Sequence, residues 1–259
     1  MLFDSHAHLD DPQFDGDRDA VIESLKAYGV GMVTNIGACI KTSKQAVALA
    51  NQYDFIYATV GVHPGETIGM CEQDMDALRT LVKENPKVRA IGEIGLDYHY
   101  DDANPEEQKL WFRRQLELAK ELSMPVVIHD RDSKGECIHI LKEMNVTNGV
   151  MHCFSGSAQT AAELVKMGFM ISFTGVLTFK NARRAVEACA AVPMERLMIE
   201  TDCPYMAPEP HRGERNFSGY VKHVAEKMAE IKGISVEEVE RITTENAIRF
   251  YGIDSPVGL

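Results

Sequence analysis

Eight short runs of apolar, β-favouring residues alternate with longer amphipathic segments along this chain. The runs are Leu2–His6, Met32–Ile36, Ile56–Val62, Val88–Ile94, Val126–His129, Gly149–His152, Phe169–Phe173 and Leu197–Thr201. Each run has the length and composition of a buried strand. The segments between them carry apolar residues at spacings of three and four, which is the period of a helix. Strand and helix are therefore expected to alternate eight times.

Seven helices follow from the spacing of the apolar residues. They are expected at Ala20–Ala27, Lys44–Gln52, Met75–Lys83, Pro105–Leu122, Ala158–Lys166, Tyr220–Ile231 and Val236–Phe250. Pro105 followed by two glutamates is typical of a helix start, because proline fits the first turn and acids favour its positive end. Ser235 and Glu238 predict a capping box for the last helix. The Pro- and Gly-rich segment 207–218 is expected to be a long loop.

Eight strand–helix units in 259 residues have the size and rhythm of a (β/α)8 TIM barrel. We therefore expect one barrel domain over residues 1–259, with the active site at the C-terminal ends of its strands. The alternative is an open doubly wound sheet. That fold usually places a glycine-rich phosphate turn after its first strand, where this chain carries His6-Ala7-His8.

The composition restricts where and on what the protein acts. No apolar run is long enough to cross a bilayer and the N-terminus does not resemble a signal peptide, so a cytoplasmic protein with no membrane partner is expected. Six cysteines without CxxC spacing predict reduced, mostly buried thiols. The net charge of −12 argues against a broad basic surface for nucleic acid, although bound metal ions could supply positive charge locally.

Histidines and acidic residues concentrate where the expected strands end. His6 and His8 are two positions apart, so they project from the same face of the first strand. The other residues at strand ends are His63, Glu93, His129, His152 and Asp202. Because barrel enzymes build their sites at these ends, a convergent metal site is expected. The glycines around Glu93 predict open space beside it, and His63, which precedes a proline, is either a substrate contact or a turn cap.

Two kinds of neighbouring residue are assigned structural roles. Asp4 and Glu200 share a face with His6 and Asp202 but lie a layer deeper, so they are expected to be buried structural acids. Cys153 and Cys203 each follow a metal-ligand candidate and should point the opposite way, as packed thiols.

Six candidate ligands are too many for one tetrahedral ion with an open position. They are His6, His8, Glu93, His129, His152 and Asp202. Such a set suits two ions roughly 3.5–4 Å apart that share a carboxylate and a hydroxide. The mixture of nitrogen and oxygen donors permits Zn, Mn, Fe, Ni or Co and leaves Mg possible, so two divalent cations such as Mg, Mn or Zn are expected.

Together, these motifs resemble the TatD family of metal-dependent deoxyribonucleases, which belongs to the amidohydrolase-like barrels. The matching segments are His6-Ala7-His8, Gly61-Val62-His63-Pro64, Gly92-Glu93-Ile94-Gly95-Leu96-Asp97, Ile128-His129, His152-Cys153-Phe154-Ser155-Gly156, Glu200-Thr201-Asp202-Cys203-Pro204 and Asn246-Ala247. The resemblance implies one ion on His6, His8 and Asp202. It implies a second ion on His129 and His152, with Glu93 bridging the two. The implied activity is hydrolysis of DNA phosphodiesters, typically from a 3′ end of single-stranded DNA.

The working mechanism is in-line attack by a metal-bridging hydroxide, with Asp202 and Glu93 as catalytic residues. Asp202 would orient the hydroxide and accept its proton. The expected phosphate-binding residues are His63, Arg131, Arg212 and Arg215. Lys180, Arg183 and Arg184 would either hold the nucleic-acid backbone or form a solvated helix face. Near Arg212 the loop departs from the family pattern, because Glu214 replaces a basic residue and a proline is missing.

Two other functions stay open. The first is hydrolysis of a small ester, lactone or amide in the same barrel, which the acidic composition favours. Such barrels often bridge their ions with a carboxylated lysine, and here Glu93 takes that place. The second is a metal-holding scaffold for a partner protein. No obligate protein partner is indicated, and a monomer is expected.

Overall fold

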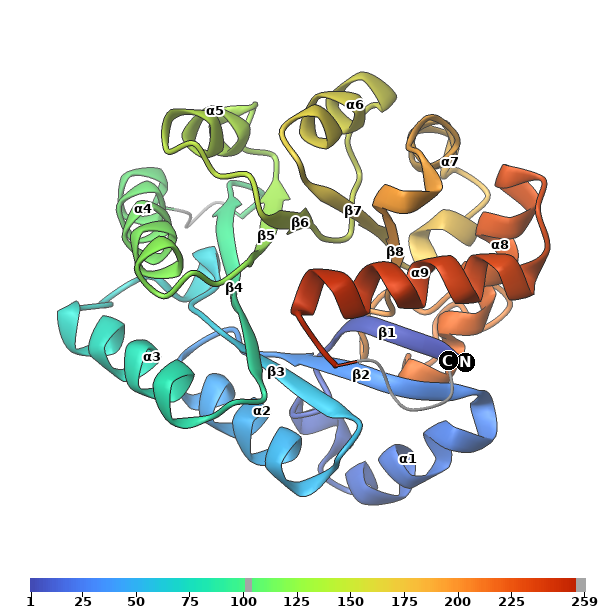
Figure 1. The fold of residues 1–259 in the computed structure, drawn as a ribbon, viewed down its shortest axis with the longest axis horizontal. Coiled ribbons are helices and arrows are strands. Elements are labelled where there is room, and N and C mark those ends of the chain that lie inside the picture. Colours follow the sequence, from blue (N-terminus) through green and yellow to red (C-terminus); the bar gives the residue numbers. More distant parts are fainter. Residues whose placement is uncertain (101–103, 255–259) are drawn as a thin grey trace. The chain divides into compact units, whose positions relative to one another are not determined.

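The strands of this chain pair in the order in which they occur. The computed structural model describes residues 1–100 and 104–254. Within them, the eight strands are β1 (Leu2–Ala7), β2 (Val30–Ile36), β3 (Ile56–Val60), β4 (Val88–Asp97), β5 (Val126–Arg131), β6 (Gly149–Met151), β7 (Met170–Phe173) and β8 (Leu197–Ile199). They form one sheet in the order β1 to β8 (Figure 1). With helices alternating between the strands, this is the topology of the expected (β/α)8 barrel.

Nine α-helices lie in the part of the chain that the structure describes. They are α1 (Arg18–Ser24), α2 (Ile40–Gln52), α3 (Glu72–Glu84), α4 (Pro105–Glu121), α5 (Glu136–Glu143), α6 (Ala158–Lys166), α7 (Arg183–Ala191), α8 (Val221–Lys232) and α9 (Val236–Tyr251). All seven expected helices are present, and α5 and α7 are additional. No helix within the described residues is both long and apolar enough to cross a membrane.

The helix ends follow the capping residues of the sequence. The Asn104 side chain accepts a hydrogen bond from the Glu107 amide at 3.3 Å, and Pro105 occupies the first turn of α4. Ser235 accepts from the Glu238 amide at 3.2 Å at the start of α9. At the other end of α9, Gly252 adopts a left-handed conformation with φ of 57°, which glycine tolerates at little cost.

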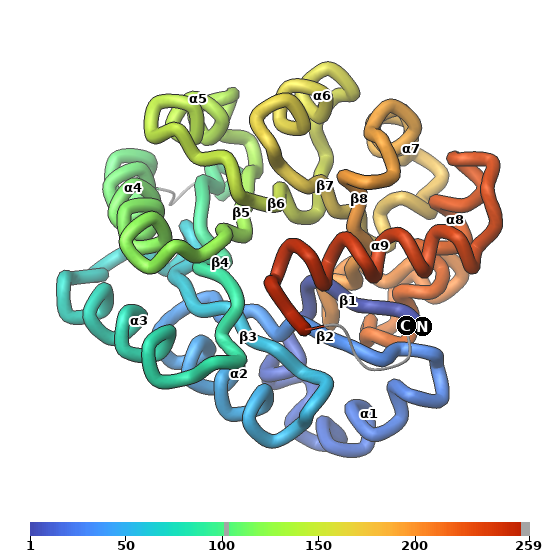
Figure 2. The backbone as a smooth tube through the Cα atoms, viewed as in Figure 1, coloured from blue at the N-terminus to red at the C-terminus, as the bar shows by residue number. Residues whose placement is uncertain are grey.

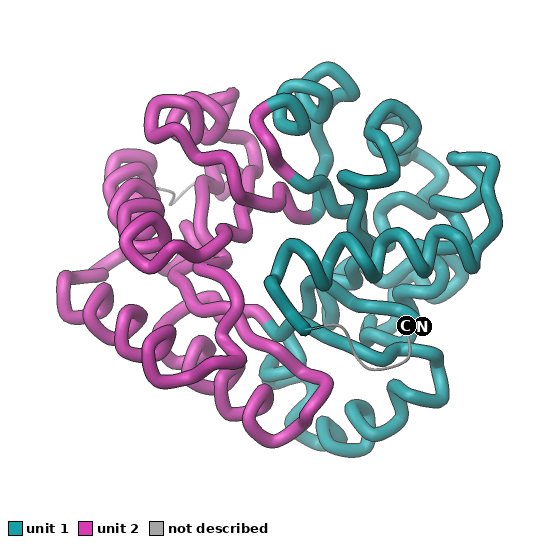
Figure 3. Tube along the Cα trace, viewed as in Figure 1, with its two compact units in different colours: residues 1–35, 153–166, 170–259 teal, residues 36–152, 167–169 magenta. Residues whose placement is uncertain are grey.

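Contacts group the chain into two compact units, each described here by itself (Figure 3). Unit 1 contains residues 1–35, 153–166 and 170 onward, and it includes the parallel pairs β1–β2 and β7–β8. Helix α9 packs on β1 and β8 (Figure 2). The Tyr251 hydroxyl donates to the Ser5 carbonyl at 2.8 Å, and the Asn246 amide donates to the Leu197 carbonyl at 2.8 Å. The last helix therefore fixes the strands that carry His6 and lead to Asp202.

Unit 2 contains residues 36–152 and 167–169, with β3 to β6 paired in parallel. Two buried glutamines of α4 hold the ends of two of its strands. The Gln108 side chain accepts from the Asp97 amide at 2.9 Å and donates to its carbonyl at 2.8 Å. Gln115, two turns further on, pairs in the same way with the amide and carbonyl of Val62, at 2.7 and 3.0 Å. One helix face thus sets the backbone at Asp97 and next to His63.

Replacing Gln115 with leucine is expected to destabilise the fold by about 2–4 kcal/mol, because it leaves the buried amide and carbonyl of Val62 without their partner. Urea denaturation would measure this free energy. The matched control is Gln73→Leu, which makes the same change at an exposed position of α3 and should stay within about 0.5 kcal/mol of the unchanged protein. Equal stability of the two variants would contradict the bracing role.

Candidate metal centre

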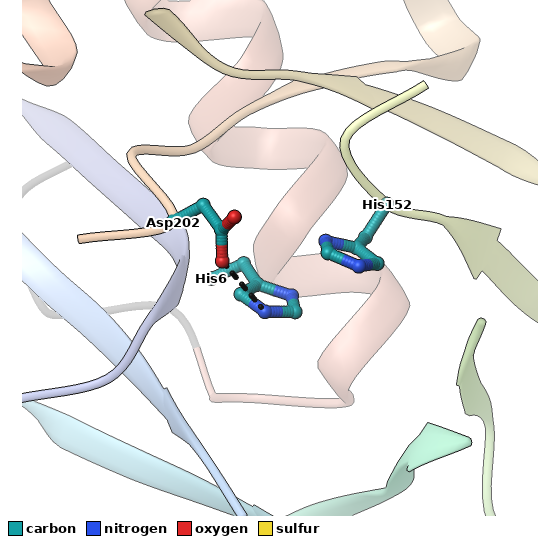
Figure 4. A group of neighbouring side chains, drawn as sticks. All are labelled: His6, His152 and Asp202. Atoms are coloured by element: carbon teal, nitrogen blue, oxygen red, sulfur yellow. Dashed lines mark ion pairs between the residues drawn. The ribbon is translucent and has the colours of Figure 1, made fainter. Parts of the chain in front are cut away.

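The first group of predicted ligands lies in unit 1 and consists of His6, His8 and Asp202, named here the His6 cluster. The Nε2 atoms of His6 and His8 are 3.3 Å apart. Oδ1 of Asp202 lies 3.5 Å from the first and 3.4 Å from the second. Figure 4 shows the ion pair between His6 and Asp202. The strand period thus brings the two histidines together as predicted.

The His6 cluster has the dimensions of one face of a metal polyhedron. An ion bound by nitrogen and oxygen at about 2.0–2.1 Å in tetrahedral geometry separates its ligand atoms by roughly 3.4 Å. The three separations in this cluster are 3.3, 3.4 and 3.5 Å. The His6 ring is buried and the other two side chains are about one-seventh exposed. The donor types and spacing therefore fit a divalent ion with one side open to solvent.

The alternation of side chains along a strand does not explain the position of Asp202 in this cluster. Strand β8 ends at Ile199, and Asp202 lies beyond it in a left-handed conformation with φ of 57°. The Asp202 amide donates to the His6 carbonyl at 2.9 Å, and the His8 amide donates to the Cys203 carbonyl at 2.8 Å. Backbone pairing with the end of β1 therefore positions this carboxylate, and the expectation that Asp202 ends a strand is wrong.

The two acids near this cluster are buried, as expected. Asp4 accepts hydrogen bonds from the amide and hydroxyl of Thr201 at 2.9 and 2.6 Å, and burial raises its pKa to about 7. Glu200 accepts from the Cys153 amide and the Ser172 hydroxyl, both at 2.6 Å. Their carboxylates are therefore engaged in holding neighbouring loops and strands.

The cysteines agree with the prediction in part. All six are free thiols, and the Cys203 sulfur is buried 3.8 Å from the Ser218 hydroxyl. Cys153 is half-buried with its sulfur 3.5 Å from the Thr174 hydroxyl. Cys137 and Cys189 are buried, whereas Cys71 is exposed. Half of the thiols are therefore buried, so "mostly buried" overstates the result.

The second group of predicted ligands lies in unit 2 and consists of Glu93, His129 and His152, named here the Glu93 cluster. Oε1 of Glu93 is 2.8 Å from Nδ1 of His129 and 2.7 Å from Nε2 of His152. These two nitrogens are 3.2 Å apart. The carboxylate is buried. One carboxylate oxygen and two imidazole nitrogens converge here, which is a donor set suited to a transition-metal ion.

The register of β4 and β5 builds the Glu93 cluster. Strand β4 continues four residues past Glu93, to Asp97, and Gly95 lies opposite His129. A Cβ atom on Gly95 would collide with the His129 carbonyl, so only glycine allows the two strands this close. The glycines near Glu93 thus permit strand contact, and the expectation that they leave open space is wrong.

Asp97 is a functional candidate that the sequence analysis did not single out. Its Oδ2 lies 3.2 Å from Nε2 of His129, on the opposite side of the ring from Glu93. Burial lowers the pKa of His129, but hydrogen bonds with Asp97 and Glu93 outweigh this effect, so its pKa is raised. The signal was present: Glu93, Gly95 and Asp97 are two apart, so they share one strand face once β4 is known to be long.

His63 is a turn cap whose ring also reaches the Glu93 cluster. Its Nδ1 accepts a hydrogen bond from the Gly65 amide at 3.0 Å, at the start of the 3-10 helix Pro64–Glu66. Its Nε2 lies 3.8 Å from Oε1 of Glu93. Burial lowers its pKa to about 4, with the Glu93 charge opposing this, so the ring is neutral at pH 7. Because Nδ1 accepts a hydrogen bond and must carry a lone pair, Nε2 of the neutral ring carries the hydrogen and is a donor rather than a metal ligand.

The predicted phosphate-binding arginines have partners within their own units. The Arg131 guanidinium, at the end of β5, lies 5.5 Å from the Tyr100 ring centre. Arg212 lies 3.7 Å above the Phe179 ring. Arg215 donates to both carboxylate oxygens of Asp17, at 2.8 and 2.6 Å. Substrate binding by these residues stays a prediction, and Arg215 would have to leave Asp17 to take part.

The basic residues after β7 divide between a loop and a helix. Lys180 precedes α7, and Arg183 and Arg184 begin it. The Arg183 side chain is exposed and pairs with Glu187 at 2.8 Å on the same helix. This is the solvated helix face that the sequence analysis allowed.

Barrels that carry buried clusters of histidine and carboxylate on their strands are typical of metal-dependent hydrolases. A family model described as TatD related DNase matches residues 3–252. The chain therefore belongs to the TatD family of metal-dependent hydrolases.

Individual relatives resemble this chain over nearly its whole length. It is 47% identical over 256 residues to the metal-dependent hydrolase YabD of Bacillus subtilis (strain 168), covering 98% of this chain and 100% of YabD. It is 34% identical over 260 residues to the 3′-5′ ssDNA/RNA exonuclease TatD of Klebsiella pneumoniae (strain 342), covering 98% of both. The crystal structure of YJJV, a TatD homologue from Escherichia coli K12, matches with a TM-score of 0.92 at 30% identity, covering 98% of both chains.

Proposed function

We propose that this protein is a metal-dependent exonuclease that removes nucleotides from the 3′ end of single-stranded DNA. The observation that carries the proposal is the pair of three-donor clusters, each of which brings two histidine nitrogens and one carboxylate oxygen within 3.5 Å of one another. The relative from Klebsiella pneumoniae, which is named a 3′-5′ ssDNA/RNA exonuclease, supports this choice of substrate.

In this proposal, each cluster would hold one divalent ion. Divalent ions lower the pKa of water and offset negative charge that develops on a phosphate. The chain's own residues orient the reactants. Asp202 positions the attacking water and accepts its proton, because its carboxylate is partly exposed beside two histidines. Glu93 would hold an ion together with His129 and His152.

His63 and the arginines bind the phosphate in this scheme. The Nε2–H group of His63 is fixed as a donor by the Gly65 amide, so a neutral ring can donate to a non-bridging phosphate oxygen. Arg131 offers a two-pronged donor at the end of β5. Arg212 and Arg215, in the loop after β8, are the other candidates for binding a phosphate oxygen, and Arg215 would have to leave Asp17 to do so.

One observation favours hydrolysis of a small ester, lactone or amide instead. The net charge is −12, and Arg215 already pairs with Asp17. A strongly negative chain repels a polyanion more than it repels a small or neutral substrate. This second candidate uses the same clusters and differs only in the substrate.

The deciding experiment offers the full-length chain, reconstituted separately with Mg²⁺, Mn²⁺ or Zn²⁺, a panel of substrates. The panel contains single-stranded DNA, duplex DNA and RNA, each labelled at the 5′ or the 3′ end, together with simple esters and lactones. We expect a ladder of 5′-labelled products that shortens with time on single-stranded DNA, and no cleavage after chelation.

A matched oligonucleotide with 3′-terminal phosphorothioate linkages serves as the control. It should resist an enzyme that begins at the 3′ end and should not resist one that cuts internally. Turnover of an ester or lactone without cleavage of any oligonucleotide, with every metal, would overturn the exonuclease proposal in favour of the second candidate.

A further inference from the structure

The His129 ring lies between two carboxylates, one at each ring nitrogen. Its Nδ1 is 2.8 Å from Oε1 of Glu93, and its Nε2 is 3.2 Å from Oδ2 of Asp97. A neutral imidazole carries one N–H group and one lone pair, and only the lone pair can bind a metal ion. Whichever nitrogen keeps the proton therefore decides which side of the ring is the ligand.

Asp97 is held more rigidly than a carboxylate at the end of a strand would usually be. It is only 4% exposed, and its Oδ1 accepts a hydrogen bond from the His99 amide at 2.9 Å. The amide and carbonyl of Asp97 are both paired with Gln108. With Oδ1 occupied by the His99 amide, Oδ2 faces Nε2 of His129, where a carboxylate oxygen accepts a hydrogen bond from the ring.

We propose that Asp97 is a positioning residue that keeps the proton of His129 on Nε2 and so presents the Nδ1 lone pair to a metal ion at the Glu93 cluster. The inference rests on the proposed metal-binding role of that cluster and extends it to a residue outside the ligand set. Carboxylates that orient ligating histidines in this way tune both the ring orientation and the basicity of the ligand nitrogen.

The neighbouring His63 uses its Nδ1 for a hydrogen bond within the protein instead of presenting it to the Glu93 cluster. The rings of His63 and His129 are in edge contact, with their centres 4.4 Å apart. The Gly65 amide donates to Nδ1 of His63, which leaves the proton on Nε2. His63, Asp97 and His129 also lie close enough to enclose a cation. With Nδ1 of His63 engaged by the Gly65 amide, its Nε2 carries a hydrogen and offers no lone pair to that group. The two histidines are thus assigned different roles, one as ligand and one as donor.

Nitrogen-15 NMR of the full-length chain loaded with Zn²⁺ tests the tautomer directly and needs no variant. We expect the shift of a protonated Nε2 and an unprotonated, metal-bound Nδ1 for His129, assigned by comparison with His129→Gln. A protonated Nδ1 would overturn the proposal.

A second measurement uses Asp97→Asn, in which the amide can donate to Nε2 and favour the wrong tautomer. Calorimetric titration with Mn²⁺ should show one class of sites weakened by roughly 10- to 100-fold. The matched control is Asp130→Asn, which removes a carboxylate that hydrogen-bonds to Ser133 and interacts with His129 only through its charge. If both variants bind Mn²⁺ equally weakly, loss of negative charge alone explains the weaker binding, and the positioning role of Asp97 is overturned.

The two proposals can fail separately, because neither measurement uses a nucleic acid. If the chain cleaves no DNA but Asp97→Asn still weakens Mn²⁺ binding and the tautomer is as stated, the exonuclease proposal fails and this inference stands. If the chain cleaves DNA and Asp97→Asn binds Mn²⁺ as tightly as the unchanged protein, the positioning role fails alone.

Discussion

Asp202→Asn is expected to lower kcat/KM by about 10³-fold or more, because it removes a residue proposed both as a metal ligand and as the proton acceptor. Asp202 supplies the only carboxylate of the His6 cluster and lies 3.5 and 3.4 Å from its two histidine nitrogens. Asparagine has nearly the same shape but no charge, so the backbone hydrogen bonds to β1 that position residue 202 should be kept. The readout is the rate of shortening of a labelled single-stranded oligonucleotide, with metal content measured by elemental analysis.

Asp15→Asn provides the matched control for this prediction. It makes the same chemical change in unit 1, at an exposed carboxylate that pairs with Arg18. We expect its activity and metal content to equal those of the unchanged protein. An Asp202→Asn variant that keeps more than about one-tenth of the activity at full metal content would contradict the assignment of the His6 cluster.

The sequence predicts those parts of this fold that depend on local periodicity. Buried parallel strands read as short apolar runs, and the run from Leu2 corresponds to β1 with six buried residues. His6 and His8 could be paired from the sequence because a strand repeats every two residues. The same rule places Asp4 below His6, and the structure confirms a buried acid there.

Prediction fails where tertiary contacts override the local period. Asp202 lies three residues past the end of β8, and backbone bonds to β1 position it, which no pattern in its own segment encodes. Strand β4 runs on to Asp97 because β5 and α4 supply partners for its last residues. The sequence therefore singles out Glu93 as a candidate ligand but not the acid four residues later that contacts the same histidine.

For Gly95 and Arg215, too, contacts with residues distant in the sequence decide the role. Because Gly95 has no side chain, the sequence suggests open space beside it, but the backbone of the neighbouring strand at His129 occupies that space. The sequence suggests that Arg215 is available to bind phosphate. In the structure it is paired with Asp17, which is distant in the sequence. In both cases the residue type is correctly read, and its partner can be known only from the fold.

Glu93→Gln is expected to abolish measurable hydrolysis, a loss of about 10³- to 10⁴-fold, and to remove one class of metal sites. Oε1 of Glu93 lies within 2.8 Å of two histidine nitrogens and is the only carboxylate oxygen among the three atoms of the Glu93 cluster. The neutral amide cannot offset the charge of a divalent ion, and it can turn its NH₂ group toward the nitrogen lone pairs. Calorimetric titration with Mn²⁺ and the oligonucleotide assay measure the two effects independently.

Glu84→Gln is the control for this variant, because it makes the same change in unit 2 at an exposed position near the end of α3. Its metal binding and its activity should match those of the unchanged protein. The informative comparison is between the two readouts for Glu93→Gln. Loss of both is the expected result, since the carboxylate holds the ion and the ion is needed for cleavage. Full activity would show that hydrolysis does not depend on the Glu93 cluster, whereas full metal binding without activity would leave Glu93 a role in catalysis but not as a ligand.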